Sequence, residues 1–298
     1  MNRLVLIDGH AMVFRAYYAF PTSLTTKSGE LINAVYGFAS ILLTVIKDLH
    51  PEYLAVAFDL DKPTFRHLEY VDYKAQRPEV EEELTNQLER VREVVRILNI
   101  PIFEVEGFEA DDVIGTLSRQ ASGQEDIETV IVTGDQDAMQ LVNGSVKIYQ
   151  PARGKIEAKV YSGRQVRERY GLEPNQIIDL KALAGDSSDN VPGVKGIGPK
   201  TATELIQKFG SVEETFKHLD QVPEKKRQLL IDHYEDALKS KKLVTIVCDV
   251  PITLDLSACK VSDYDQKAAI QLFEELGFKS LIKKLPGEDR PSPQLGLF

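Results

Sequence analysis

Apolar runs that end in acidic residues recur along the first half of this chain. The runs and the acids after them are RLVLI (3–7) before Asp8, YLAVAF (53–58) before Asp59 and TVIVT (129–133) before Asp135. Runs that are apolar at every position are typical of central parallel strands covered on both faces. Because the carboxyl ends of parallel strands share one crevice, we expect these acids to meet there.

Strand-like and helix-like segments alternate as far as about residue 180. The further strand-like runs are 101–105 and 145–150, and the helical patterns lie at 33–49, 84–98 and 110–121. This alternation predicts an α/β domain with a mostly parallel sheet flanked by helices. After about residue 161 helical segments dominate, at 163–170, 174–184, 199–209 and 223–242, which predicts a second, helical subdomain. Residues 286–298 are rich in proline and are expected to form a flexible tail.

Nine carboxylates fall in five clusters placed at strand ends or helix starts. They are Asp8, Asp59, Glu109, Asp111, Asp112, Asp135, Asp137, Asp186 and Asp189. Each one alone could be a turn former or a helix cap, but five such clusters together indicate a site for cations. Oxygen ligands without His or Cys suit Mg²⁺ or Mn²⁺ rather than zinc. Two such ions roughly 3.5–4 Å apart would hold the attacking and leaving oxygens of a phosphoryl group, so we predict a metal-dependent phosphoryl-transfer or phosphodiester-cleaving enzyme.

The net charge of −10 argues at first against a nucleic-acid partner. Without the nine clustered carboxylates it is about −1, and two bound divalent cations bring it to about +3, so the total conceals the metal site. No apolar stretch approaches the ~20 residues of a membrane span, and the first residues enter a strand with no room for a signal peptide. Cys248 and Cys259 form no metal-binding spacing or disulfide framework. A cytoplasmic monomer is expected.

The segment GVKGIGPKTA carries the second constellation, between two predicted helices. Its candidate contacts are Gly193, Lys195, Gly196, Gly198, Lys200 and Thr201. An NTP-binding P-loop is excluded because Pro199 stands where that motif needs lysine and no strand precedes it. Glycines at tight positions and a proline opening the next helix predict a helix-hairpin-helix that holds a nucleic-acid backbone without reading bases. An ordinary turn between two helices is the alternative.

Basic and aromatic residues interleave in two further places. In 65–77, Arg66, Lys74 and Arg77 alternate with aromatics that include Tyr73. Basic side chains neutralise phosphates and aromatic rings stack on unpaired bases, although a solvated charged helix would look similar. About two helical turns after Asp8, Phe14 and Arg15 are candidate contacts for a terminal base and its phosphate.

These segments together resemble one family, the 5′-nuclease (5′→3′ exonuclease, flap endonuclease) domain of bacterial DNA polymerase I. The matching stretches include IDGHAMVFRAYYA, AFDLDKPTFRH, YKAQRP, GFEADDVIGTL, VTGDQDAMQLV, RYGLEP and LAGDSSDNVPGVKGIGPKTA. The resemblance implies a PIN-like core over 1–180 with a helical arch at about 62–100, and a helix-hairpin-helix subdomain over 181–285. It also implies two-metal hydrolysis at 5′ flaps, nicks and 5′ ends of DNA, as in RNA-primer removal and repair.

The resemblance also assigns roles to residues. It implies that Asp8, Asp59, Glu109 and Asp111 ligate a first metal, that Asp135, Asp137, Asp186 and Asp189 surround a second, and that Asp112 supports both. Lys74 and Arg77 would polarise the scissile phosphate, Phe14 would stack on the terminal base, and Arg15 and Arg66 would contact phosphates. The hairpin at 193–200 would hold K⁺ against the duplex.

The chain departs from the family pattern after Arg77, where PEVEEE replaces a proline-rich run, and residues 1–298 include no polymerase segment. The last residues resemble a peptide that docks bacterial replication proteins on the sliding clamp, through Gln294, Leu295, Leu297 and Phe298. Two alternatives remain open. A haloacid-dehalogenase-type phosphatase would use Asp59 and Asp61, and a non-enzymatic helix-hairpin-helix scaffold would need none of the carboxylates.

Overall fold

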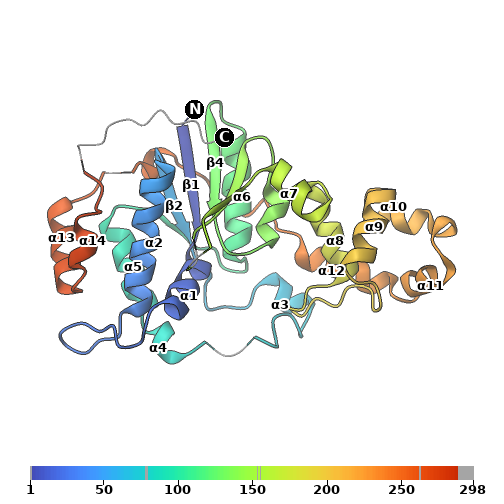
Figure 1. Ribbon diagram of the computed structural model, residues 1–298, viewed down its shortest axis with the longest axis horizontal. Coiled ribbons are helices and arrows are strands. Elements are labelled where there is room, and N and C mark those ends of the chain that lie inside the picture. Colours follow the sequence, from blue (N-terminus) through green and yellow to red (C-terminus); the bar gives the residue numbers. More distant parts are fainter. Residues whose placement is uncertain (1, 78–79, 153, 155, 262, 288–298) are drawn as a thin grey trace.

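A six-stranded sheet forms the centre of the computed structural model, which describes residues 2–77, 80–152, 154, 156–261 and 263–287 (Figure 1). The strands are β1 (Asn2–Asp8), β2 (Tyr53–Ala57), β3 (Ile102–Phe103), β4 (Ile127–Val132), β5 (Val146–Gln150) and β6 (Lys159–Tyr161). Their order is β3-β2-β1-β4-β5-β6, parallel except for β6, which pairs antiparallel with β5. The register pairs Asp8 with Ala57 and Ile7 with Val132. The carboxyl ends of β1, β2 and β4 therefore lie side by side.

Helices cover both faces of the sheet, because the strands are apolar at successive positions. Leu4 and Leu6 point into a core with α6 (Ala110–Ser122), while Val5 and Ile7 point into the opposite core with α1 (Gly9–Ala19), α2 (Asn33–Leu49) and α5 (Leu88–Ile97). The alternation of side chains along a strand sends neighbours to opposite faces. This three-layer arrangement confirms the predicted α/β class.

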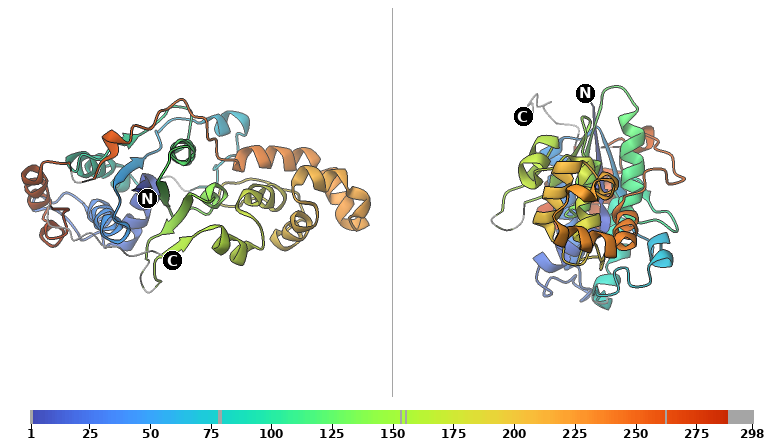
Figure 2. Two further views of the ribbon diagram at one scale, coloured as in Figure 1. Left: turned by 90° about the horizontal axis from the view of Figure 1, so that it is seen from above. Right: turned by 90° about the vertical axis from the view of Figure 1, so that its right-hand side faces the viewer.

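A helical lobe extends from one side of the sheet (Figure 1; Figure 2, left). Its helices are α7 (Gly163–Tyr170), α8 (Ile177–Ala184), α9 (Pro199–Phe209), α10 (Val212–Lys217), α11 (Glu224–Asp232) and α12 (Tyr234–Val244). Helix α12 packs along α8, so the chain returns toward the sheet after the outermost turn. Two helices that follow, α13 (Gln266–Glu275) and α14 (Lys279–Ile282), pack on α5 and α2 at the far side of the sheet.

Two predicted boundaries are wrong. Residues 266–282 belong to the core around α2 and α5, so the helical subdomain does not extend to residue 285. The proposed arch of about 62–100 is also too long, because Val91, Val94 and Val95 of α5 are buried in that same core. The segment that crosses the carboxyl edge of the sheet, along the bottom of Figure 1, carries α3 (Phe65–Glu69) and α4 (Glu82–Thr85).

The short strand β6 was not predicted, because its three residues show no apolar run. None of the helices in the described ranges is long and apolar enough to cross a membrane. The predicted clamp-binding residues Gln294, Leu295, Leu297 and Phe298 lie outside the described residues.

Candidate metal-dependent active site

Asp8 and Thr133 join the ends of the two central strands. Asp8 caps α1, where its Oδ1 accepts a 2.9 Å hydrogen bond from the backbone N–H of Ala11. Its Oδ2 accepts a 2.7 Å bond from the Thr133 hydroxyl, and Thr133 Oγ1 in turn accepts the backbone N–H of Asp135 at 3.0 Å. Asp8 is only 6% exposed and Thr133 is fully buried. Thr133 ends a predicted strand but is not among the predicted metal-site residues.

The amino terminus of α6 brings a second set of carboxylates to the same edge. Glu109 and Asp112 form a reciprocal capping box, and the Asp59 Oδ1 accepts a 2.7 Å bond from the N–H of Ala110. Acidic groups are favoured here because a helix amino terminus carries partial positive charge. Asp111 stands in the first turn, where the charges of Asp135, Asp8 and Asp59 act on it. Strand ends and one helix start thus converge, as the sequence predicts.

The central carboxylates repel one another. Burial, with the charges of Asp59 and Asp135 added, raises the pKa of Asp8 to about 7. Burial and the negative charges of Asp135, Asp8 and Asp59 raise the pKa of Asp111 well above its usual range. The pKa of Asp135 is raised by burial and by Asp189, although Lys181 opposes this. Several hard oxygen donors that lie close together without enough positive charge to neutralise them form a site suited to divalent cations such as Mg²⁺ or Mn²⁺.

Three basic side chains neutralise the outer carboxylates. Lys181 forms ion pairs with Asp137 and with Asp186, the latter at 2.6 Å. Although burial alone would raise it, hydrogen bonds from Lys181 and Ser188 hold the pKa of Asp186 below its usual value. The other contacts are Lys74 Nζ to Glu109 at 2.9 Å, Arg77 to Asp189 at 2.5 Å, and the Tyr73 hydroxyl to Glu109 and Asp189 at 3.2 Å each.

As these side chains stand, the described residues contain no three acidic, histidine or cysteine groups arranged to hold one ion together. The carboxylates point instead toward Lys74, Arg77 and Lys181. To bind a divalent cation, these carboxylates would exchange their basic partners for the ion within the same crevice. Lys181 was not among the predicted site residues, but it lies five positions before Asp186 on the helix that leads into GDSSDN.

We predict that the metal-free protein loses stability as the pH rises from 5 to 8. The raised pKa of Asp8 means that the folded state binds this proton more tightly than the unfolded chain. Its stabilising contribution is full below the unfolded value and disappears as the pH passes through about 7. Thermal melts in EDTA should show the fall, and excess Mg²⁺ should remove it because the cation favours the ionised form. A melting temperature in EDTA that stays level or rises over this range would contradict the prediction.

Arg66 and Asp112 are paired with each other, which corrects two predictions. The Arg66 guanidinium makes two 2.7 Å bonds to the Asp112 carboxylate and also donates to the carbonyl oxygens of Leu243 and Thr245. Asp112 is fully buried and Arg66 is 2% exposed. An arginine enclosed in this way does not reach a DNA phosphate. A carboxylate with both oxygens so engaged is not free to ligate a metal, although Asp112 Oδ2 also accepts the backbone N–H of Glu109 at 3.1 Å and so holds that residue in place.

The predicted hairpin lies between α8 and α9. Gly193 has φ of 60° and packs so tightly that a Cβ there would lie 2.2 Å from the backbone nitrogen of Gly185. Gly196 has φ of 90°, and Pro199 opens α9 with Gly198 as its cap. Only glycine adopts such positions without strain. The structure therefore has the predicted helix-hairpin-helix, with Lys195 and Lys200 exposed and Thr201 partly so.

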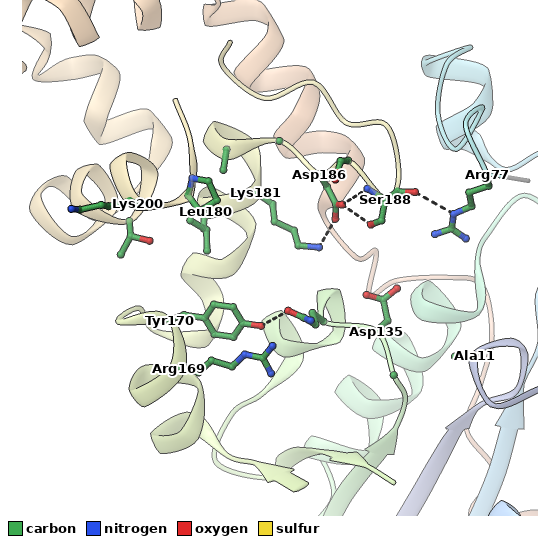
Figure 3. A pocket seen from close by; sticks show the side chains of 17 residues that line it. Ala11, Arg77, Asp135, Arg169, Tyr170, Leu180, Lys181, Asp186, Ser188 and Lys200 are labelled. Atoms are coloured by element: carbon green, nitrogen blue, oxygen red, sulfur yellow. Dashed lines mark hydrogen bonds and ion pairs between the residues drawn. The ribbon is translucent and has the colours of Figure 1, made fainter. Parts of the chain in front are cut away.

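Two cavities flank this edge. The first, of about 910 Å³, runs from Asp135, Lys181 and Asp186 to Lys200 on the hairpin (Figure 3). The second, of about 870 Å³, includes the predicted contacts Phe14 and Arg15. Arg15 donates to the backbone carbonyl of Pro151 at 2.8 Å and also to that of Ala152.

His10 is a further residue beside the carboxylates that was not predicted from the sequence. Its Nδ1 accepts the backbone N–H of Asp59 at 3.0 Å, and its ring lies against Phe14 and Phe58. It comes two residues after Asp8, in the first turn of α1. His10 thus links Asp59 to the buried Phe58 and to Phe14, which lines the second cavity.

Comparison with protein families supplies the deciding observation. A model described as "5'-3' exonuclease, N-terminal resolvase-like domain" matches residues 3–171, and one described as "5'-3' exonuclease, C-terminal SAM fold" matches residues 172–267. The chain belongs to the 5′-3′ exonuclease family. The boundary between the two matches lies nine residues before the predicted one at 180.

Curated relatives of this exonuclease include DNA polymerase I of Chloroflexus aurantiacus, 48% identical over 290 residues, and of Bacillus subtilis, 40% identical over 289 residues. These matches cover 95% and 97% of the chain but 31% and 32% of the relatives. The chain thus spans about a third of their length.

Solved structures share the exonuclease fold. The bacteriophage T5 flap endonuclease, in a pseudo-enzyme-product complex with DNA and metal ions, superposes with a TM-score of 0.68. It is 24% identical, over 93% of this chain and 100% of that one. The catalytic core of Rad2 in complex with DNA substrate gives a TM-score of 0.60 at 18% identity, over 92% and 86% of the two chains. The alternative of a phosphatase that uses Asp59 and Asp61 does not fit, since the chain belongs to the exonuclease family and Asp61 lies exposed at a bend.

Proposed function

We propose that this exonuclease hydrolyses DNA at 5′ flaps, nicks and 5′ ends by a two-metal mechanism, as in primer removal and repair. The observation that carries the proposal is the electrostatic state of the crevice. Asp8, Asp111 and Asp135 all have raised pKa values because burial and mutual repulsion disfavour their charges. The helix-hairpin-helix at the other end of the first cavity suits a duplex backbone, and the fold relatives bound to DNA agree with this use.

The residues divide naturally into two groups of ligands. Asp8, Asp59, Glu109 and Asp111 come from β1, β2 and the start of α6, and would hold the first Mg²⁺ or Mn²⁺. Asp135, Asp137, Asp186 and Asp189 come from the loops after β4 and α8, and would hold the second. Asp112 is not included, because both its oxygens are bound by Arg66.

Divalent cations held there would activate water and neutralise charge on the scissile phosphate. The chain's own contribution comes from Lys74 and Arg77, on the segment that crosses the crevice. Both are paired with carboxylates of the site, Glu109 and Asp189. With those carboxylates engaged by cations, Lys74 and Arg77 would be free to donate to phosphate oxygens, where they would stabilise the developing negative charge. No side chain needs to act as a nucleophile.

The test compares a 5′-labelled flap, a nicked duplex and a single strand, each with Mg²⁺ and with EDTA. We expect cleavage of the flap and the nick in Mg²⁺ and none in EDTA. Full activity in EDTA would refute metal-dependent hydrolysis. Hydrolysis of p-nitrophenyl phosphate with intact DNA would favour the phosphatase, and duplex binding without any cleavage would favour a scaffold.

Lys74→Met should lower kcat on the flap substrate by about 100-fold, the typical cost of one donor to developing charge. Lys74 has φ of 56°, a left-handed conformation unusual for a side-chain-bearing residue, and its N–H donates to the Asp189 carbonyl at 3.0 Å. Its Nζ lies 2.9 Å from Glu109 Oε1, among the carboxylates of the crevice. Lys62→Met is the matched control, because Lys62 pairs with Glu106 on the exposed surface. Equal kcat values for the two variants would exclude the role of Lys74.

Further parts of the proposal rest on sequence. Phe14 and Arg15 would receive the terminal base and its phosphate, and the hairpin would hold K⁺. Residues 294–298 would dock the protein on the sliding clamp, which would raise its effective concentration at nicks. Deletion of residues 294–298 should reduce the amount of sliding clamp that the protein retains in a pull-down. An unchanged amount would refute the proposed clamp interaction.

A further inference from the structure

An arginine that the proposed mechanism does not use faces the crevice from the end of α7. Arg169 is exposed, and its guanidinium carbon lies 5.4 Å from the centre of the Tyr161 ring and 5.1 Å from that of Tyr170. Its Nη1 donates a 2.8 Å bond to the Tyr161 hydroxyl. Tyr170 is itself anchored, because its hydroxyl donates to Gln136 at 2.8 Å. Two rings thus hold an exposed arginine in one orientation.

The charge of Arg169 is not neutralised by a carboxylate. In the part of the chain that the structure describes, no acidic oxygen lies within ion-pairing distance of it. Its neighbours on α7 differ, since Arg164 pairs with Glu168 at 2.8 Å and Arg167 with Glu173 at 2.9 Å. A guanidinium has five N–H donors in a planar fork that matches phosphate. Arg169 therefore presents a fixed positive charge with donors left for an anion.

Arg169 also stands where the two cavities meet. Both are lined by Ala11, Gly134, Gln136 and Arg169, so they adjoin along these residues. One cavity leads to the carboxylates and the hairpin, and the other leads to Phe14. Figure 3 shows Arg169 beside Tyr170, across the cavity from Lys181 and Asp186, with its guanidinium directed toward the segment that carries Asp135. A DNA strand that passed from one cavity to the other would run beside the Arg169 side chain.

We propose that Arg169 binds a backbone phosphate of the DNA substrate between the metal cluster and the Phe14 cavity. This inference rests on the proposed function and adds a positioning contact to it. The phosphate would replace solvent at a guanidinium already oriented by Tyr161 and Tyr170, so little side-chain freedom is lost on binding. Because the contact is to the backbone, it sets the register of the strand over the carboxylates without reading its sequence.

The test measures binding of a flap DNA in EDTA by fluorescence anisotropy over a range of KCl concentrations. Arg169→Met should bind about 10-fold more weakly at low salt, the size expected for one charge-assisted contact. The slope of its log affinity against log salt concentration should be shallower by about 0.9, because one phosphate contact is lost. Arg164→Met removes an equal charge from the same helix and should match the wild type. Arg169→Lys should keep the salt slope, and in Mg²⁺ Arg169→Met should raise KM with little change in kcat.

Substrates with one neutral methylphosphonate linkage then locate the contact. At one linkage the substitution should weaken the wild type and leave Arg169→Met unaffected, a result that a merely structural role would not give. If the methionine variant does not fold, Arg169→Gln repeats the comparison. The inference is overturned if the wild type binds and cleaves the flap while Arg169→Met keeps the wild-type salt slope, or if every linkage affects both proteins equally. A wild type that neither binds nor cleaves the flap would instead refute the proposed function.

Discussion

Asp111→Asn should lower cleavage of a flap substrate about 1,000-fold or more, a loss of about 4 kcal/mol of transition-state stabilisation. Asp111 is surrounded by Asp8, Asp59 and Asp135, whose charges raise its pKa in addition to burial. A neutral amide there removes one charge from the centre of the cation site. The measurement is single-turnover cleavage in Mg²⁺, with DNA binding in EDTA expected to persist.

The same substitution should stabilise the metal-free protein. Asp111 is held among like charges, and asparagine has nearly its shape without its charge, so the repulsion disappears. The melting temperature in EDTA should rise, while the increase that Mg²⁺ gives to the wild type should shrink. Asp61→Asn, at an exposed bend two residues after Asp59, is the control and should change neither. An active Asp111→Asn protein, or a less stable one in EDTA, would contradict this account of the site.

Arg66→Met should destabilise the fold by about 3–5 kcal/mol, the range for breaking a buried ion pair. The loss arises because the fully buried Asp112 carboxylate would keep its charge without the guanidinium that neutralises it. Urea denaturation measures the effect. Arg96→Met, which removes an exposed pair with Glu89, should cost less than about 1 kcal/mol.

A double variant separates the ion pair from simple loss of packing. Arg66→Met combined with Asp112→Leu leaves no unpaired charge, so it should be more stable than Arg66→Met alone. If the double variant is the less stable protein, the buried charge is not the source of the loss. Cleavage should fall in Arg66→Met together with stability, since Arg66 also fastens the carbonyls of Leu243 and Thr245.

The sequence predicted the fold well wherever local chemistry determines it. The apolar runs before Asp8 and Asp59 became central strands, and α2, α7 and α9 have the predicted bounds. The hairpin could be predicted because glycine tolerates the positive φ found at Gly193, and because proline is favoured at the first position of a helix, where Pro199 lies. Strand β6 and the return of α13 to the core depend on pairing and packing with distant residues, which local patterns do not encode.

The candidate site shows the same division. The positions of the strand ends predict which carboxylates come together. They do not predict which basic side chain or hydroxyl each carboxylate contacts. Arg66 lies in a basic, aromatic stretch that looks like a DNA contact, and only the fold shows that it faces Asp112. Lys181 and Arg169 lie in ordinary helical sequence, and their positions beside the carboxylates come from how α7 and α8 pack on the sheet.

The return of the chain after α12 has a mechanical consequence. The helical lobe leaves the core at β6 and rejoins it through residues 245–250, where the backbone N–H of Val247 donates to Asp112 at 2.9 Å and that of Val250 to Thr116 at 3.1 Å. A lobe with two attachments cannot swing about a single joint as a tethered domain does. Force applied to the hairpin by a duplex would pass along the second attachment directly to α6, the helix that begins with Glu109 and Asp111. The lobe and the catalytic edge should therefore move as one lever.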